Sequence, residues 1–153
     1  MNKFNKLKSE IKNVKFGKLC KIIEPVNLYG CKLGISVFVG PFVEIQKNVI
    51  IGNYSRVQSH SFVCEQVTIG SNCFISHGVM FINDLVNKGS INRKPRSFKK
   101  TFVGNNVVIG SNSTILPVKI NSNIVIGAGS VVTKNLKTKG IYAGNPAKLI
   151  RKL

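Results

Sequence analysis

A six-residue repeat covers much of this chain and limits how it can fold. Eight consecutive blocks, from LGISVF (33–38) to ISHGVM (75–80), each open with an aliphatic residue. The register returns at IGSNST (109–114), INSNIV (120–125) and IGAGSV (126–131). Six residues of strand extend only about 20 Å, so each block forms one short strand and one corner. Such strands bury their apolar residues by stacking coil on coil, so the repeat predicts a β-solenoid.

The main alternative is an ordinary β-sandwich. Its strands would show a period of two, with turn residues every 8–12 positions or so. The aliphatic residue at every sixth position over residues 33–80 argues against that arrangement.

Several segments resemble the hexapeptide-repeat acyltransferases: GPFVEIQ (40–46), SHSFV (59–63), HGVMFIND (77–84), VIGSNSTILP (108–117), VIGAGSVVTK (125–134) and YAGNPAKLIRK (142–152). The resemblance implies an all-β fold, a left-handed parallel β-helix with three hexapeptides per coil, which is usually a homotrimer. It is strongest to enzymes that N-acetylate a 3-amino-3-deoxy sugar on a nucleoside diphosphate. It therefore implies acetyl-CoA as co-substrate and a dTDP- or UDP-3-amino-3-deoxyhexose as acceptor, for surface polysaccharide (O-antigen) biosynthesis.

Composition bounds the class of protein. A chain of 153 residues with 43% hydrophobic residues is expected to form one domain with a filled core. It has no run of 18 apolar residues, and residues 1–15 lack the apolar region of a signal peptide, so we expect no membrane span and a cytoplasmic location.

The net charge is +18, from 23 Lys and Arg against 5 Asp and Glu. Such a basic surface suits polyanions, either nucleic acid or the phosphates of coenzyme A and a nucleotide sugar. The alternative is that the positive charge reflects a compositional bias toward lysine and has no binding role. Because no aromatic-interleaved RNA-binding strand is present, we expect no nucleic-acid function.

The repeat divides the single domain, 1–153, into segments. Residues 1–32 are expected to form an N-terminal arm and an irregular capping coil, with residues 1–13 as an amphipathic helix or a loose cationic arm. Regular coils are expected over 33–82 and 101–133. The block ILPVK (115–119) is one residue shorter than a hexapeptide and predicts a tighter corner. Residues 134–153 are expected to be turns and a short helix over 147–153, beginning at Asn145–Pro146.

An excursion over residues 83–100 interrupts the repeat. It is polar and carries Arg93, Lys94, Arg96, Lys99 and Lys100. A loop of this length in a compact repeat is either functional or simply solvated. The resemblance implies function, because in this family such a loop reaches the active-site groove of a neighbouring subunit.

The only histidines, His60 and His77, are 17 positions apart. A coil holds about 18 residues, so they should lie on adjacent coils. They are candidates for a site role, although a structural role stays open. A zinc-dependent hydratase of this fold class needs three histidine ligands, so no metal is expected. Cys31 and Cys73 fall at the inward fifth position of a block and are expected to fill the core, without disulfides.

Asn83 and Asp84 begin the excursion where many hydroxyl-acting relatives have a His-Pro pair, the histidine being the base. A neutral amine is already nucleophilic and only sheds a proton after attack, so the absence of that pair fits an amine acceptor. The resemblance implies that Asn83 or Asp84 hydrogen-bonds the sugar amine. An Asx-turn that leaves the helix is the alternative. His60 or His77 would orient the sugar or accept the proton.

The resemblance also implies a coenzyme A site. Gly110, Ser111, Gly127 and Ala128 would present backbone to the pantetheine arm, and Lys134, Lys148 and Arg151 are candidates for the phosphates. Two other functions remain open. One is O-acetylation of a sugar or antibiotic hydroxyl, and the other is a non-catalytic, polyanion-binding solenoid.

Overall fold

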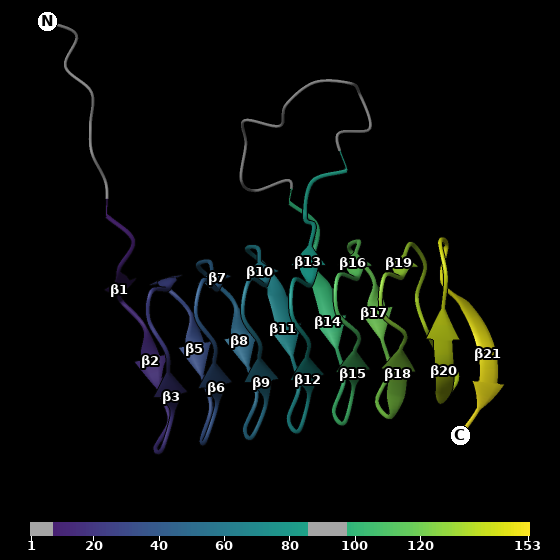
Figure 1. Ribbon diagram of the computed structural model, residues 1–153, viewed down its shortest axis with the longest axis horizontal. Helices are drawn as coiled ribbons and strands as arrows, with labels where there is room; N and C mark the ends of the chain where they lie inside the picture. Colours follow the sequence, from purple (N-terminus) through teal and green to yellow (C-terminus); the bar gives the residue numbers. More distant parts are fainter. Residues whose placement is uncertain (1–7, 86–97) are drawn as a thin grey trace, which may run out of the picture.

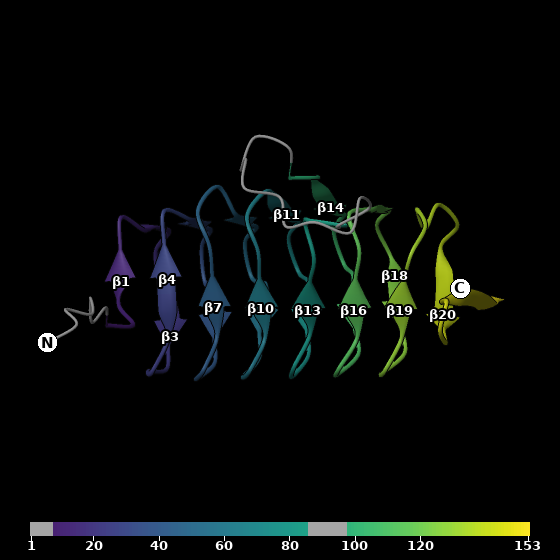
Figure 2. The ribbon, with the colours of Figure 1, turned by 90° about the horizontal axis from the view of Figure 1, so that it is seen from above.

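The computed structural model describes residues 8–85 and 98–153. In these residues the chain forms three β-sheets of mainly parallel strands, which run side by side along one long axis (Figures 1 and 2). None of the described residues is helical. No helix among the described residues is long and apolar enough to cross a membrane.

The sheets consist of very short strands. Sheet A contains β1 (Ile11–Lys12), β4 (Asn27–Tyr29), β7 (Glu44–Ile45), β10 (Phe62–Val63), β13 (Met80–Phe81), β16 (Thr114–Ile115) and β19 (Val131–Val132). Sheet B contains β2 (Lys15–Phe16), β5 (Lys32–Leu33), β8 (Ile50–Ile51), β11 (Val67–Ile69), β14 (Thr101–Val103) and β17 (Lys119–Ile120). Sheet C contains β3 (Lys21–Ile22), β6 (Phe38–Val39), β9 (Arg56–Val57), β12 (Phe74–Ile75), β15 (Val108–Ile109), β18 (Ile124–Ile126), β20 (Gly140–Ala143) and β21 (Lys148–Lys152).

The chain winds as a left-handed solenoid. It visits sheets A, B and C in turn, and each coil strand pairs in parallel with the strand one coil away. Strands of sheet A run from front to back along the top, and strands of sheet C run upward along the front (Figures 1 and 2), which gives the left-handed sense. The predicted left-handed parallel β-helix is confirmed. We name the corners between sheets the A–B, B–C and C–A edges.

The opening residue of each hexapeptide forms the core. Ile45, Ile51, Val57, Val63 and Ile69 follow one another at intervals of six, and at most 1% of each is exposed. Each lies on its counterpart in the next coil, as the pairing of Ile45 with Val63 shows. The fifth residue of each block also points inward. Where that residue is serine its hydroxyl is satisfied, as in Ser61, which donates to the Ser76 carbonyl at 2.8 Å.

Apart from the coil that holds the excursion and the shorter last coil, the coils contain either 17 or 18 residues. Leu28 pairs with Ile45, 17 positions on, whereas Ile45 pairs with Val63, 18 positions on. The missing residue lies at the A–B edge, where the inward column steps by five from Leu28 to Leu33. The same short corner occurs between Ile115 and Ile120 and confirms the tighter corner predicted for 115–119.

The N-terminal expectation was partly wrong. Residues 14–32 are regular coil rather than an irregular cap, because β2, β3 and β4 pair in register with β5, β6 and β7. Their 17-residue period disguised the repeat. Ile11–Lys12 forms β1 and pairs with β4, so the expected helix over residues 1–13 is absent from its described part, 8–13. Residues 1–7 of that segment lie outside the described residues.

The predicted C-terminal helix was also wrong. Residues 148–152 form β21, which pairs antiparallel with β20 after a turn at Gly144, whose φ is +102°. Every residue of β21 is exposed, including the apolar Leu149 and Ile150. β21 instead pairs with β20, whose backbone N–H and C=O groups would otherwise be unpaired at the end of the last coil.

The two residues of strand β8 test which side chains face the core and which face the solvent. Ile50 and Ile51 are adjacent in β8, but 44% of Ile50 is exposed against 1% of Ile51. Replacing Ile51 by Ala should reduce the free energy of unfolding by about 2–5 kcal/mol because it leaves a cavity. Ile50→Ala should cost about 0.5 kcal/mol or less. Urea unfolding measures both, and equal losses would contradict the assigned faces.

The cysteines give a second test, since all four are free thiols. Burial raises the pKa of Cys31 to about 11 and that of Cys64 to about 12, and it also raises the pKa of Cys73. Cys20 is half-buried. A disulfide reagent at pH 8 should therefore modify Cys20 first and the other three only after denaturation. Rapid modification of more than one thiol in the folded protein would contradict this burial.

Candidate functional site

Candidate residues gather along the C–A edge. Here each coil turns through a two-residue corner whose second residue has a positive φ, as at His60 (62°) and Gly78 (66°). Backbone bonds such as Gly78 N–H to the Ser59 carbonyl, 3.0 Å, hold successive corners together. The stacked corners are residues 41–42, 59–60, 77–78, 111–112 and 128–129.

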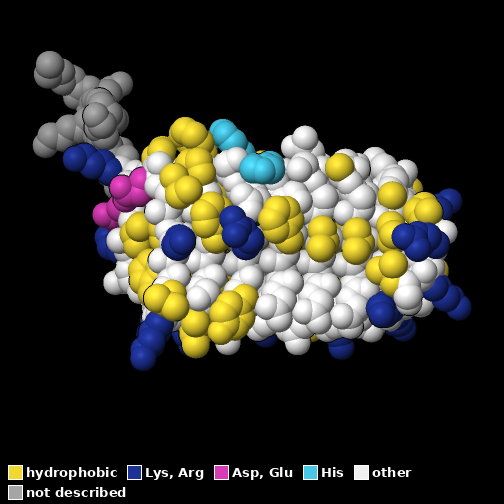
Figure 3. Space-filling model, turned by 60° about the horizontal axis from the view of Figure 1, so that its bottom comes forward, with side chains coloured by type: hydrophobic (Ala, Val, Ile, Leu, Met, Phe, Trp, Pro, Cys, Tyr) yellow, Lys and Arg dark blue, Asp and Glu magenta, His cyan; other side chains and the backbone are white. Residues whose placement is uncertain are grey.

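The two histidines occupy adjacent corners of this edge, as their spacing predicted. His60 stacks on the Phe42 ring, with centroids 4.8 Å apart and planes inclined by 18°. His77 Nδ1 lies 2.7 Å from Ser59 Oγ. Both histidines are exposed and lie close together along one margin of the molecule (Figure 3). An exposed imidazole oriented by a hydroxyl is able to bind a ligand or exchange a proton with it.

The same edge carries four residues proposed from resemblance for the pantetheine arm. Gly110 and Ser111 lie at one corner, and Gly127 and Ala128 lie at the next. Ser113 Oγ lies 2.7 Å from the Gly110 carbonyl and 3.2 Å from that of Gly127. A Cβ on Gly110 would lie 2.7 Å from the Gly127 carbonyl carbon. Close stacking of the coils therefore already requires glycine at position 110, whatever it binds.

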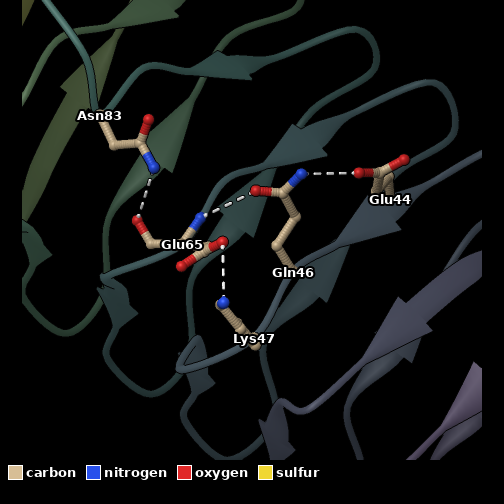
Figure 4. Close-up of polar contacts among 5 residues, drawn as sticks. All are labelled: Glu44, Gln46, Lys47, Glu65 and Asn83. Carbon is tan, nitrogen blue, oxygen red and sulfur yellow. Dashed lines mark hydrogen bonds and ion pairs between the residues drawn. The ribbon is translucent and has the colours of Figure 1, made fainter. Parts of the chain in front are cut away.

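Asn83 lies on a different edge. It follows β13 at the A–B edge, directly above Glu65 and Lys47 in the two preceding coils. Asn83 Nδ2 donates to the Glu65 carbonyl at 3.3 Å, and Lys47 Nζ lies 3.6 Å from Glu65 Oε1 (Figure 4). The Asn83 carbonyl accepts from the Lys99 N–H at 2.9 Å, which closes the base of the excursion.

The excursion itself is described only at its two ends. Asp84 is half-buried, and Lys99 and Lys100 are exposed where the chain returns to β14. Arg93, Lys94 and Arg96 lie outside the described residues.

The predicted site is thus divided within one chain. His77 precedes β13 and Asn83 follows it, six positions further along the chain. The histidines and the four corner residues share the C–A edge, whereas Asn83 and Asp84 lie on the A–B edge.

The proposed phosphate-binding cations lie near the C-terminal end. Lys134 is exposed after β19, and Lys148 and Arg151 are exposed on β21. Lys148 pairs with Ala143, whose Cβ would lie 3.0 Å from a Cβ on Gly127, so Lys148 lies near the end of the C–A edge.

Acidic residues concentrate around Asn83. Glu44, Glu65 and Asp84 are three of the five acidic residues in a chain of net charge +18, and all three lie on sheet A or its A–B edge. Across residues 8–85 and 98–153, no three potential metal-binding side chains converge. A shallow pocket of about 270 Å³ opens on sheet A, lined by Ser9, Pro25, Val26, Asn27, Phe42, Val43 and Glu44.

The sequence reasoning missed Glu44, Gln46 and Glu65, which are connected by hydrogen bonds to Asn83. A signal was present. Lys47, Glu65 and Asn83 are spaced by 18 residues, one coil apart, so the repeat that predicts the fold also places them in one column.

Comparison with known proteins agrees with this architecture. The family profile "Bacterial transferase hexapeptide (six repeats)" matches residues 30–65, and "Hexapeptide repeat of succinyl-transferase" matches residues 100–134. The bifunctional protein GlmU of Streptococcus uberis is 33% identical over 127 residues, which are 80% of this chain and 27% of that protein. GlmU of Wigglesworthia glossinidia brevipalpis is 40% identical over 109 residues, 71% of this chain and 21% of that protein. The chain thus spans about a quarter of these relatives.

Two solved structures share the fold. The polySia-specific acetyltransferase NeuO superposes with a TM-score of 0.63 at 24% identity, covering 94% of this chain and 84% of NeuO. The acetyltransferase VCA0836 of Vibrio cholerae, complexed with acetyl coenzyme A, superposes with a TM-score of 0.66 at 23% identity, covering 81% and 71%. Together with the coil geometry, the two profile matches show that the chain is built of hexapeptide repeats of the kind found in bacterial transferases.

Proposed function

We propose that this protein is an acetyl-CoA-dependent N-acetyltransferase that acts on the amino group of a nucleotide-linked amino sugar. One observation carries the proposal. Asn83, rather than a histidine, stands at the start of the excursion, and its amide is held in place by the Glu65 carbonyl. An amide side chain can hydrogen-bond the substrate group that receives the acetyl, but it cannot remove a proton from that group. This suits an amine, which attacks without a base, better than a hydroxyl.

The proposed reaction balances without a cofactor other than acetyl-CoA. The neutral amine attacks the thioester carbonyl and forms the new C–N bond. The tetrahedral intermediate then expels the thiolate of coenzyme A, and the proton lost by nitrogen finally resides on the thiol. Most of the acceleration would come from holding the two reactants together, with a backbone N–H supporting the oxyanion.

The C–A edge is the proposed donor site. Its glycine-rich corners at 110–111 and 127–128 allow close approach to the backbone, and Lys134, Lys148 and Arg151 supply positive charge toward its C-terminal end. The fold relatives named above are acetyltransferases, and one was solved with acetyl coenzyme A. His60 and His77 on the same edge are candidates to accept the proton or to orient the sugar.

The acceptor would bind on sheet A. The pocket beside Phe42 offers an exposed aromatic ring together with the amide of Asn27, groups that suit a pyrimidine base. The net charge of +18 favours the diphosphate.

The proposed coenzyme A site on the C–A edge and Asn83 on the A–B edge lie on opposite margins of sheet A in one chain. We therefore propose that the site forms between copies, the C–A edge of one subunit facing the A–B edge of the next. A homotrimer, which the family resemblance implies, would provide three such sites.

A second candidate is O-acetylation of a sugar or antibiotic hydroxyl. The 2.7 Å contact between His77 Nδ1 and Ser59 Oγ favours it, because an oriented imidazole is the base that a hydroxyl needs.

A panel of acceptors separates the candidates. With acetyl-CoA, dTDP- and UDP-linked 3-amino-3-deoxyhexoses should release thiol, and their hydroxyl counterparts should not. Release should increase from about pH 6 to about pH 8 as the neutral fraction of the amine rises. Thiol release with hydroxyl sugars would instead favour O-acetylation. Failure to bind acetyl-CoA, with salt-sensitive binding to nucleic acid, would favour the polyanion-binding solenoid.

Substitution of Asn83 tests its role directly. Asn83→Ala should reduce turnover by about 10-fold or more, while the calorimetric Kd for coenzyme A changes by less than about 2-fold. Asn53→Ala is a matched control, because Asn53 accepts a backbone bond from Ile35 at the distant B–C edge. It should leave turnover unchanged. Unaltered turnover in Asn83→Ala would remove this residue from the mechanism.

A further inference from the structure

A chain of hydrogen bonds runs from Glu44 on sheet A along the A–B edge to Asn83 (Figure 4). Gln46 Nε2 donates to Glu44 Oε1 at 2.8 Å, and the Glu65 N–H donates to Gln46 Oε1 at 3.2 Å. The Glu65 carbonyl in turn accepts from Asn83 Nδ2 at 3.3 Å. Gln46 lies two coils below Asn83 and takes no direct part in the proposed reaction.

Glu44 decides which way the Gln46 amide faces. A carboxylate at neutral pH accepts hydrogen bonds and donates none, so the Gln46 nitrogen must face Glu44. The Gln46 oxygen then faces the Glu65 N–H. Asn27 Nδ2 binds the other oxygen of Glu44 at 3.1 Å and fixes its carboxylate. Gln46 thereby holds the backbone of Glu65 in place.

The same reasoning fixes the amide of Asn83. A carbonyl only accepts, so the Asn83 nitrogen faces Glu65, and the Asn83 oxygen points away from it (Figure 4). The backbone of Asn83 is held separately by the Lys99 N–H. The side chain therefore presents a hydrogen-bond acceptor to whatever binds at this corner.

We propose that Gln46 is a positioning residue for acceptor binding. Through Glu65 it keeps the Asn83 oxygen turned outward, where it can accept a hydrogen bond from the N–H of the substrate amine. This inference rests on the proposed amine acceptor and adds the residue that orients its recognition group. Glu65, held by Lys47, transmits the constraint through its backbone rather than its side chain.

Exchange of two side chains tests this role. Gln46→Glu alone places a carboxylate against that of Glu44 and should reduce kcat/KM for the amino-sugar acceptor about 10-fold, with KM for acetyl-CoA within about 2-fold. The double variant Glu44→Gln/Gln46→Glu restores the same bonds with donor and acceptor exchanged, since the carboxylate introduced at position 46 would accept from both neighbours. It should recover most of the acceptor kcat/KM. A general loss of folding would also change KM for acetyl-CoA, which the positioning role leaves within about 2-fold.

Side-chain amide NMR supplies a readout that needs no substrate. The Asn83 NH₂ signals, assigned by their loss in Asn83→Ala, should shift in Gln46→Glu and return in the double variant. Thr68→Val, on the outer face of sheet B, is the control and should leave them in place.

The two readouts separate two failures. If the Asn83 signals respond as expected but no amino sugar is acetylated, the proposed function is wrong and the positioning by Gln46 stands. If the signals are unmoved in Gln46→Glu, or the double variant fails to restore them, the inference about Gln46 is overturned, whatever the enzyme acetylates.

Discussion

The stacking of one short coil on the next governs this structure. Most strands are two or three residues long, and their backbone hydrogen bonds join one coil to the next. The core is a column of aliphatic residues such as Ile45 and Val63. A single coil cannot bury its own residues of that column. Inward residues are consequently committed to packing, and variation is left to the outward positions and the edges.

Function is therefore expected at the edges, and the candidate residues do lie there. The C–A edge repeats a two-residue corner, and at successive coils this corner carries Phe42, His60 and His77, then the small residues near 111 and 128. The A–B edge contributes Asn83, where a corner is replaced by an excursion. Coil stacking explains the glycine at position 110 without any ligand, so the case for function there depends on position rather than on residue type.

Much of the fold follows from the period of six, which predicted the solenoid, the inward cysteines Cys31 and Cys73, and the placement of both histidines on adjacent coils. The first coils were missed because they lack one residue per turn, and β21 was misread as a helix because its pairing depends on the open edge of β20, a tertiary feature. The bonds among Glu44, Gln46 and Glu65 depend on side-chain orientation across coils, which a linear pattern does not express.

The central claim is that acetyl transfer takes place where the histidine edge of one subunit meets the Asn83 edge of another. A crystal structure of the protein with coenzyme A tests it most directly. The account predicts the pantetheine arm along the corners at 110–111 and 127–128, with its sulfur near Asn83 of a neighbouring copy. Coenzyme A bound away from the C–A edge, or a sulfur remote from every copy of Asn83, would contradict the account.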